Sequence, residues 1–353
     1  MSPGPSRMAA VTFTNVGITG MVTTVGGRKL DFVDEREALG LSVEEGDRLQ
    51  RSIGLSSRHV VIRPDTTTAD LCLHSAQRLL EGLGIDAAGI DGLILVTQTP
   101  DYASPSTAIR LQHMLGMRID TACFDMRLGC SGFVYGLSMA ASLVESGLQR
   151  VLLCVGDVAS RMVPDDNHAI TPLMGDAGAA ILIERKPGFA RFQLYSDGSG
   201  EMGLYIPNSG LRRDAEDEGK PALMEMNGAA VFNFTLKRVP AMLTSILDSV
   251  GWRADEIGHF VLHQPNRYIL RNVQKRLGLA EEKLPSSTQS IYGNQNSASI
   301  PGTICGFLSD SYGTHAQRSI FAGFGVGLSW AACAIETEPM FVCPPYLYES
   351  EIQ

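Results

Sequence analysis

The segment Phe124-Asp-Met-Arg-Leu-Gly-Cys-Ser-Gly-Phe133 places Cys130 between an extended run and an apolar helical run. Asp120–Leu128 mixes β-branched, aromatic and apolar residues, which predicts a strand. Ser131–Ser146 is proline-free, mostly apolar and long enough for a buried helix. A glycine precedes the cysteine and another follows two residues later, and glycine permits a sharp bend. A thiol at a helix N-terminus is biased toward thiolate, so the segment predicts a nucleophilic cysteine on a strand-to-helix turn. A buried structural cysteine is the alternative.

The composition is that of a globular protein with a sizeable core. The chain has 353 residues, of which 44% are apolar and 19% charged, with a net charge of −9. This length suffices for two domains or for one large fold made of two halves. The negative charge argues against non-specific binding to nucleic acid. No window of about 18 uninterrupted apolar residues occurs, so no membrane span is expected. The first ten residues lack the features of a signal peptide.

The cysteines give no sign of a disulfide framework or a metal site. They are odd in number, scattered and without a CxxC pair, at positions 72, 123, 130, 154, 305, 333 and 343. This pattern favours a reducing compartment, so we expect a cytoplasmic protein without a bound metal.

Helical and extended patterns alternate along the chain. Val11–Ile18 predicts a first strand, Thr68–Leu83 a helix and Leu93–Thr97 a strand buried on both faces. Pro240 interrupts an otherwise helical pattern over Ala229–Val250, and we expect it to kink or restart that helix.

The second part of the chain repeats the first. Gly84–Thr97 aligns with Gly251–Gln264 at a constant offset of 167, and each block reads as a helix end, a turn and a buried strand. Near the ends of the two parts, Gly175–Glu184 resembles Gly325–Glu336. Such self-similarity indicates an internal duplication, with two βαβ-containing halves packed about a pseudo-twofold axis.

The duplication sets the expected organisation of the chain. The boundary is expected near Lys186-Pro-Gly188, which gives an N-terminal half, 1–187, carrying the cysteine and a C-terminal half, 188–353. Adding 167 to the position of Cys130 gives 297, which falls inside Gly293–Pro301.

A histidine and an asparagine lie at corresponding places in the second half. His263 ends the strand equivalent to Leu93–Thr97, and open α/β sheets place ligands beyond the carboxyl ends of their strands. Asn294 lies in the segment equivalent to the cysteine turn. Alone, each has an ordinary explanation, as a core histidine or as a turn asparagine after glycine. Together with Cys130 they predict one site shared by both halves.

Five motifs in order carry a resemblance to a known family. They are Gly129-Cys-Ser-Gly-Phe133, Gly175-Asp-Ala-Gly-Ala179, His263-Gln-Pro-Asn266, Gly293-Asn294 with Ser297-Ala-Ser-Ile-Pro301, and Phe324-Gly-Val-Gly327. From about Val11 to Glu336 the chain resembles β-ketoacyl-acyl-carrier-protein synthase III of the thiolase-like superfamily. The resemblance implies an α/β, thiolase-like fold with two duplicated halves in a layered α-β-α-β-α arrangement.

The resemblance also implies a decarboxylative Claisen condensation, as in fatty acid biosynthesis. Cys130 would take an acyl group from a thioester, and His263 and Asn294 would hydrogen-bond malonyl-acyl carrier protein while it loses carbon dioxide. The backbone N–H groups of Cys130 and Val326 would form the oxyanion hole. No metal or other cofactor is implied, and Asp176 is expected to be structural.

The chain departs from the family at the expected coenzyme A positions. Arg48 and Ser52 stand where the family has a tryptophan and an arginine, and His168 stands at a second family arginine. The donor is then either carrier-bound or a coenzyme A held differently. Ser104 replaces a bulky aromatic in the loop expected to reach the acyl pocket of a partner in a homodimer. We expect it to admit a longer or bulkier acyl chain.

Basic residues near the expected mouth predict docking of an acidic carrier protein, with a solvated helix face as the alternative. They are Lys237, Arg238, Arg267, Arg271, Lys275 and Arg276. Alternative functions are an acyltransferase or a specialised secondary-metabolite condensing enzyme on the same scaffold, a cysteine hydrolase, or a catalytically silent partner subunit. The tail over 337–353 extends beyond the resemblance and has no role that the sequence assigns.

Overall fold

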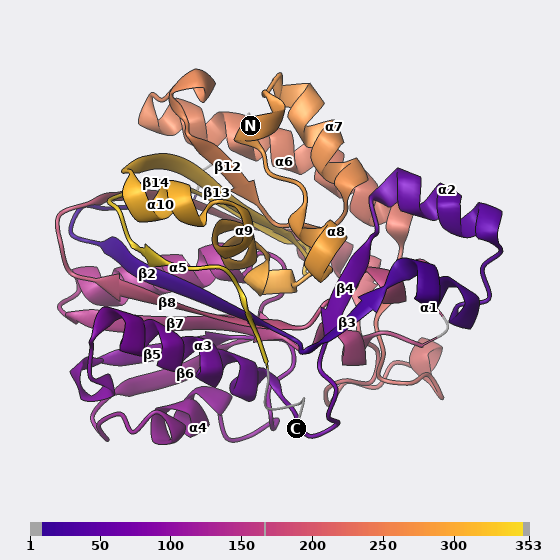
Figure 1. Cartoon of the computed structure of the whole chain (residues 1–353), viewed down its shortest axis with the longest axis horizontal. Helices are drawn as coiled ribbons and strands as arrows, with labels where there is room; N and C mark the ends of the chain where they lie inside the picture. The colour runs from indigo at the N-terminus through magenta and orange to yellow at the C-terminus, as the bar shows by residue number, and fades with distance from the viewer. Residues whose placement is uncertain (1–8, 166, 349–353) are drawn as a thin grey trace, which may run out of the picture.

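The computed structural model describes residues 9–165 and 167–348, which form two main β-sheets (Figure 1). The first sheet has the order β15-β2-β8-β7-β5-β6, with β16 also pairing with β2, and the second has the order β1-β9-β14-β13-β12. The strands of the first sheet are β2 (Gly17–Val25), β5 (Gly92–Val96), β6 (Ala122–Met126), β7 (Arg150–Asp157), β8 (Ala177–Glu184), β15 (Phe341–Val342) and β16 (Tyr346–Leu347). Those of the second are β1 (Ala9–Phe13), β9 (Phe189–Ser196), β12 (His259–Leu262), β13 (Gln317–Gly325) and β14 (Ser329–Thr337).

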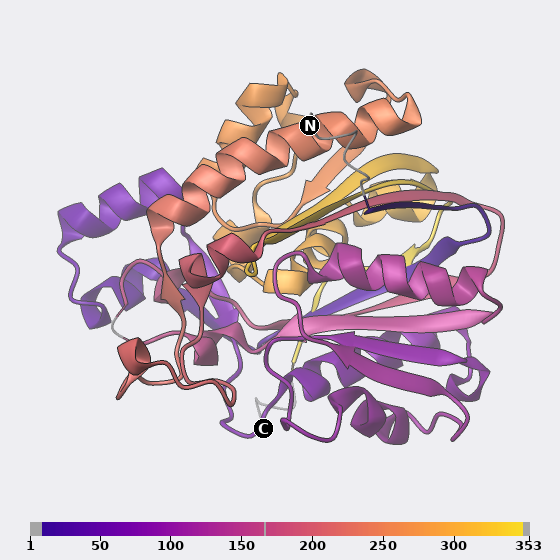
Figure 2. The same ribbon diagram turned by 180° about the vertical axis from the view of Figure 1, so that it is seen from behind.

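Helices cover both outer faces and fill the space between the sheets (Figures 1 and 2). α3 and α4 pack on the first sheet, α5 and α9 lie between the sheets, and α6 and α7 cover the second. Their bounds are α3 (Thr68–Leu83), α4 (Thr107–Met114), α5 (Gly132–Glu145), α6 (Gly228–Val250), α7 (Arg267–Leu277) and α9 (Ser299–Phe307). Each helical layer has its own apolar core. The predicted α-β-α-β-α layering is therefore confirmed.

The duplication is visible in the order of the strands. The first sheet contains β2-β8-β7-β5 and the second contains β9-β14-β13-β12, the same path in chain order. Adding 167 to Gly92, Gly132 and Arg150, the first residues of β5, α5 and β7, gives the first residues of β12, α9 and β13. The division at 187/188 stays a prediction, because β1 joins the second sheet and β15 and β16 join the first.

One prediction about local structure was wrong. Val11–Ile18 is not one strand but the end of β1 and the start of β2, which pair with β9 and β8 in different sheets. Of the two outcomes expected at Pro240, a kink or a restart, the restart does not occur, since α6 runs through the proline from Gly228 to Val250. Val239 and Leu243, on either side of the proline, are buried in the outer core, and this packing offsets the hydrogen bond that proline cannot make.

An N-terminal excursion packs beside the turn that precedes β8. It comprises β3 (Arg28–Asp31), α1 (Phe32–Ala38), α2 (Val43–Ile53) and β4 (Ser57–Val60). The buried Arg58 lies 2.6 Å from Glu35 and donates to the carbonyl of Met174 at 3.1 Å. The carboxylate of Asp176 accepts from the N–H of Val61 at 2.9 Å and from the backbone and hydroxyl of Ser160. These contacts hold the excursion next to the Met174–Asp176 turn.

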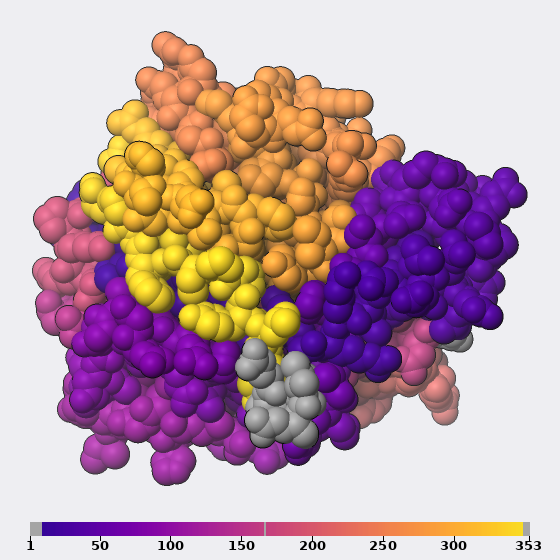
Figure 3. All heavy atoms as spheres, viewed as in Figure 1, coloured from indigo at the N-terminus to yellow at the C-terminus, as the bar shows by residue number. Residues whose placement is uncertain are grey.

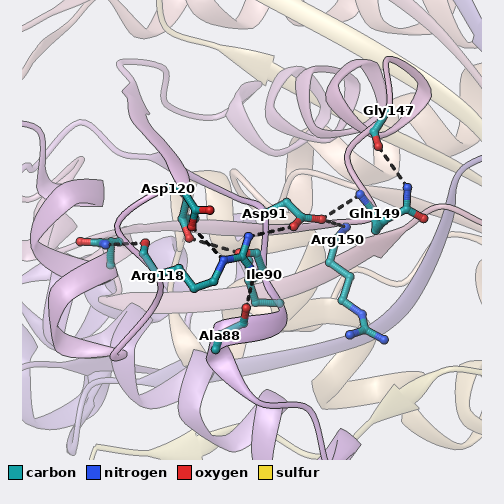
Figure 4. A network of polar contacts seen from close by, with 10 residues as sticks. Ala88, Ile90, Asp91, Arg118, Asp120, Gly147, Gln149 and Arg150 are labelled. Carbon is teal, nitrogen blue, oxygen red and sulfur yellow. Dashed lines mark hydrogen bonds and ion pairs between the residues drawn. The ribbon is translucent and has the colours of Figure 1, made fainter.

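A polar network ties together the starts of the parallel strands (Figure 4). Asp91, just before β5, accepts from the N–H groups of Gln149 and Arg150 at 2.9 and 3.0 Å, where β7 begins. Arg118, which precedes β6, lies 3.3 Å from Asp91 and 2.8 Å from Asp120. Exposed ion pairs of this kind contribute only about 0–1 kcal/mol each, so the network aligns the strands more than it stabilises them.

Two further helices and a small antiparallel strand pair lie outside these layers. They are α8 (Thr288–Tyr292), which packs against β4 and α9, α10 (Ser309–Thr314), which packs against α9 and β15, and the pair β10 (Leu204–Tyr205) and β11 (Glu225–Met226).

The C-terminal tail covers the edge of the first sheet. β15 and β16 both pair in parallel with β2, and the tail runs as a yellow band across the surface in Figure 3. Phe341 packs closely over α3, because a Cβ atom added at Gly82 would lie 2.1 Å from its ring. A paired edge cannot recruit another chain. The described part of the tail thus has a structural role, and 349–353 lie outside the described residues.

Removing the Phe341 ring should weaken this edge. We expect Phe341→Ala to lower the free energy of unfolding by about 2 kcal/mol, since a half-buried ring loses packing and leaves a gap over Gly82. Urea unfolding followed by circular dichroism measures this change. Leu347→Ala, at the exposed end of the tail, is the control and should change stability little. An unchanged urea midpoint for Phe341→Ala would show that the tail does not stabilise the sheet.

Candidate active site

Cys130, His263, Asn294 and Val326 line one cavity of about 80 Å³ between the two halves, which we call the catalytic cavity. A larger pocket of about 410 Å³ adjoins it, and we call this the outer pocket. The two share four lining residues, Gln98, Leu204, Met224 and Val326. The structure thus brings the three predicted side chains and the predicted oxyanion segment to a single place.

Cys130 lies in the turn between β6 and α5 and is buried, with 8% of its surface exposed. Burial raises the pKa of its thiol to about 12, while the backbone N–H groups of Val326 and Cys130 oppose that rise. The loss of water therefore outweighs the bias toward thiolate that a helix N-terminus gives, and the resting group is the thiol. The same two N–H groups lie against the sulfur, where an oxygen on an attached acyl group would lie.

His263 follows directly on β12. Its N–H donates to the carbonyl of Ala322 at 2.8 Å, which extends the pairing with β13, and its ring Nδ1 lies 3.2 Å from the hydroxyl of Ser299. Burial lowers the pKa of His263 to about 4, and the backbone of Asn296 raises it to a smaller extent. The imidazole is therefore neutral near pH 7, with one nitrogen that donates and one that accepts.

Asn294 is held by backbone hydrogen bonds to the turn that precedes β8. Its N–H donates to Leu173 at 2.6 Å and its carbonyl accepts from Gly175 at 3.1 Å. Its side-chain Oδ1 accepts from the N–H of Asn296 at 3.0 Å, which leaves its NH₂ group to donate into the catalytic cavity. Gly293 permits this arrangement, because a Cβ atom there would lie 2.7 Å from the nitrogen of Gly175.

The rest of the catalytic cavity is mostly apolar. Its walls include apolar side chains from the 170–174 turn, from β10, β11 and the residue before β11, from α6 and α7, and from β13: Ile170, Leu173, Met174, Leu204, Met224, Met226, Val231, Ile269 and Phe324. An apolar wall with a few polar groups at one end suits a ligand with an apolar chain and one reacting carbonyl.

Other predicted residues lie outside both cavities. Ser104 is exposed in the 101–105 loop and lines neither of them. Arg267, Arg271 and Lys275 lie four residues apart on α7, which begins just after His263. Of the remaining basic residues, Lys237 and Arg276 are exposed.

Arg238 differs from the other members of the basic group. Its guanidinium lies 3.6 Å from Asp197 and over the ring of Trp330 at 5.4 Å from its centroid. The charge of Arg238 is therefore partly neutralised by contacts within the protein. In the part of the chain that the structure describes, the other five basic residues form no salt bridge.

The residues at the expected coenzyme A positions gather at one rim. Arg48 and Ser52 lie on α2, and Ser52 donates to the carbonyl of Leu49 in its own helix at 3.0 Å. His168 is exposed and close enough to Glu45 to lower the pKa of that carboxyl together with the Ser42 cap and Arg48. None of the three lines the catalytic cavity.

Two residues at the site were not predicted. Asn296 Oδ1 lies 3.8 Å from the Sγ of Cys130, and Asp157 is fully buried at the end of β7. Asn296 belongs to a segment that the sequence singled out, and Asp157 follows a buried strand at its carboxyl end. Its position at the carboxyl end of a buried strand could have identified Asp157 as a candidate site residue from the sequence.

Within residues 9–165 and 167–348, no group of three histidine, cysteine or acidic side chains is arranged to hold a metal ion. All seven cysteines are free. Among the helices in the same residues, none combines the length and the apolar character needed to cross a membrane.

Two family models match the chain. Residues 124–198 match the 3-oxoacyl-[acyl-carrier-protein] synthase III model, and residues 247–337 match the model of the C-terminal part of the same enzymes. The two matches contain the cysteine turn and the segments of His263 and Asn294 respectively.

Whole-chain relatives agree with these matches. The β-ketoacyl-[acyl-carrier-protein] synthase III of Streptococcus agalactiae NEM316 is 32% identical over 313 residues, covering 86% of this chain and 94% of the relative. The crystal structure of 3-oxoacyl-(acyl-carrier protein) synthase from Burkholderia xenovorans LB400 superposes with a TM-score of 0.92 at 32% identity, covering 97% of this chain and all of that one. The synthase III of Pseudomonas aeruginosa PAO1 has a TM-score of 0.82 at 26% identity, covering 94% of this chain and 100% of that one. The resemblance stated from the sequence is confirmed: the chain belongs to the 3-oxoacyl-[acyl-carrier-protein] synthase III family of the thiolase-like superfamily.

Proposed function

We propose that this protein condenses an acyl thioester primer with malonyl-acyl carrier protein through an acyl-Cys130 intermediate. The observation that carries the proposal is that Cys130, His263 and Asn294, from three separate segments, line one mostly apolar cavity. Nucleophile, donors and apolar wall are the parts that such a carbon–carbon bond formation needs.

The first half-reaction transfers the acyl group to the enzyme. The Sγ of Cys130 attacks the carbonyl carbon of the primer, and the bond from that carbon to the carrier sulfur breaks. The proton of the Cys130 thiol ends on the departing carrier thiol. The N–H groups of Cys130 and Val326, which lie against the sulfur, are proposed to bind the oxyanion that forms in this step.

The second half-reaction makes the new bond. The bond between the malonyl α-carbon and its carboxylate breaks and releases carbon dioxide. The electron pair of that bond stays on the α-carbon and forms an enolate, whose oxygen accepts hydrogen bonds from His263 and Asn294. The carbanion attacks the acyl-Cys130 carbonyl, the bond to Sγ breaks, and the sulfur takes up one proton. A neutral His263 suits this role, since it donates a hydrogen bond without adding a buried charge.

A second copy of the chain is proposed to complete the enzyme as a homodimer. β6 is the last strand of the first sheet, and most of its residues are only partly buried, so its edge can pair with another copy. In such a dimer, the loop with Ser104 would reach the outer pocket of the partner and set the acyl length. Seven free cysteines accord with a cytoplasmic location.

A specialised condensation, or transfer to an oxygen or nitrogen nucleophile, is the second candidate. It is favoured by Arg48, Ser52 and His168 at the expected coenzyme A positions, because they do not reproduce the tryptophan and the two arginines that the family has there. These residues point to a carrier-bound primer rather than a coenzyme A thioester.

Intact-mass spectrometry names the primer. Exposure to a panel of acyl-coenzyme A and acyl-carrier thioesters should add one acyl mass to the protein. The Cys130→Ala variant should gain no acyl mass, because Cys130 is the only cysteine among the described residues that line the catalytic cavity. We expect the carrier-bound thioesters to acylate Cys130 faster than the coenzyme A thioesters do. Release of free acid without an adduct would favour a hydrolase, and no reaction with any donor would favour a silent subunit.

Loss of either donor should separate the two half-reactions. We expect His263→Ala and Asn294→Ala to slow malonyl decarboxylation by about 10²–10³-fold, since each removes one hydrogen bond to the enolate oxygen. Acylation of Cys130 should continue in both. Carbon dioxide release measures the first step and intact mass the second. Equal loss of both steps would contradict the assigned roles.

Charge reversal on α7 tests carrier docking. We expect Arg271→Glu with Lys275→Glu to reduce turnover of carrier-bound substrate at low salt by about tenfold, because steering depends on complementary charge. Turnover of a small thioester that lacks the carrier should be unchanged. Arg185→Glu, exposed at the opposite end of the first sheet, is the matched control. An equal effect of the control would remove α7 as the docking surface.

A further inference from the structure

We propose that Asn296 is a positioning residue that orients the thiol of Cys130, and that the buried carboxylate of Asp157 fixes the orientation of the Asn296 amide. This inference rests on the proposed role of Cys130 as nucleophile. It assigns functions to two residues that lie beyond the Cys130, His263 and Asn294 set.

Asn296 contacts all three members of that set. Its Oδ1 lies 3.8 Å from the Sγ of Cys130, within the range of a hydrogen bond from a thiol. Its N–H donates to the Oδ1 of Asn294 at 3.0 Å, and its backbone lies against the ring of His263, where it raises the pKa of the imidazole.

The backbone of Asn296 adopts an unusual conformation to make these contacts. Its φ is +46°, and in the described part of the chain Asn208 is the only other non-glycine residue with positive φ. This region is unfavourable for residues with a Cβ atom, although asparagine tolerates it best. The surroundings therefore impose the conformation, which directs the backbone and the side chain toward different members of the site.

Asp157 lies on the other side of the Asn296 amide. It is fully buried, and its Oδ1 accepts from the N–H of Gln98 at 2.6 Å and from the hydroxyl of Thr97 at 3.0 Å. Its Oδ2 has no hydrogen-bond donor among the described residues. Burial raises the pKa of this carboxyl to about 6, so it is mostly ionised at pH 7, and the donors from Gln98, Thr97 and the Asn296 amide oppose the rise.

The carboxylate selects one of the two amide orientations. With the NH₂ group toward Asp157, the Asn296 oxygen faces the thiol and can accept its hydrogen. The flipped amide would turn its oxygen toward the carboxylate, which is repulsive, and its NH₂ toward the S–H group. Asp157 thus holds the acceptor in place, and the accepted S–H hydrogen leaves the sulfur lone pairs directed at the catalytic cavity.

The arrangement has a defined effect on the protonation of Cys130. An acceptor stabilises the thiol over the thiolate, and the charge of Asp157 acts in the same direction. The titratable groups that face the sulfur are Asp157 on β7 and His263 after β12, and α5, β13 and the 294–298 segment contribute no others among the described residues. The resting nucleophile is then an oriented thiol, which gives up its proton as the primer reacts.

Asn296→Gly tests the side chain while keeping the backbone, because glycine accepts positive φ. We expect acylation by the best thioester donor to slow by at least about tenfold, since the sulfur is no longer oriented. Alkylation by iodoacetamide at a fixed pH between 7 and 9 should become faster, since loss of the acceptor lowers the thiol pKa. Opposite changes in the two reactions would not arise from a merely structural role.

Asn208→Gly is the matched control. It also replaces an asparagine at positive φ, and it removes an amide that bonds to Asp217 and Lys220 away from Cys130. Both reactions of Cys130 should proceed at the unaltered rate in this variant. If Asn208→Gly changes them as Asn296→Gly does, the proposal is wrong.

Asp157→Asn tests the second part of the proposal. Removal of the charge should speed alkylation and slow acylation, and in an Asn296→Gly background it should no longer slow acylation. Should Asn296→Gly fail to fold, Asn296→Asp keeps the shape but removes the NH₂ group, and slower acylation is again expected. Unaltered rates of both reactions in these variants would overturn the proposal.

Alkylation needs no acyl donor, so it separates this proposal from the proposed function. An enzyme that accepts no primer but shows the expected changes in alkylation would refute the proposed function and leave the role of Asn296 intact.

Discussion

The site depends on the direct packing of the Cys130-Ser131 turn against β13 of the other half. A Cβ atom at Gly323 would lie 2.7 Å from the carbonyl of Cys130, and one at Gly325 would lie 2.7 Å from its Sγ. Glycine at both positions lets the two backbones meet with no side chain between them. Ser131 adds a hydroxyl contact to Ser329 at 2.7 Å. This contact puts the sulfur against the N–H of Val326 and opposite the segments of His263 and Asn294.

Burial then decides the electrostatics of the site. Cys130 and His263 have raised and lowered pKa values, so both are neutral in the resting protein, and their separation from water is the main cause. Each hydrogen bond in such a place is stronger than in water, whereas an unpaired charge there is costly. The buried carboxylate of Asp157, which lies near the sulfur, is held by donors from Thr97 and Gln98, just after β5. Reactivity therefore depends on orientation and on fixed donors more than on a standing thiolate.

The surroundings of the site differ in kind from its centre. The walls are apolar side chains from turns and small strands, whereas α2 and α7 present polar and basic residues at the rim. The two helices pack closely at Gly54, the C-cap of α2, since a Cβ atom there would lie 2.8 Å from the side chain of Arg267 at the start of α7.

Local sequence patterns alone determined the alternating elements, the 167-residue repeat and the places of Cys130, His263 and Asn294, because periodicity, glycine turns and strand ends are properties of neighbouring residues. The pattern could not separate β1 from β2, since the residues on both sides of the short Thr14–Val16 connection are typical of a strand. Nor could it show that Pro240 lies inside α6, which packing on both sides of the proline holds together. Only the tertiary structure revealed the raised thiol pKa of Cys130 and its proximity to Asn296 and Asp157, because these residues lie 166 and 27 positions away along the chain and come together only when it folds.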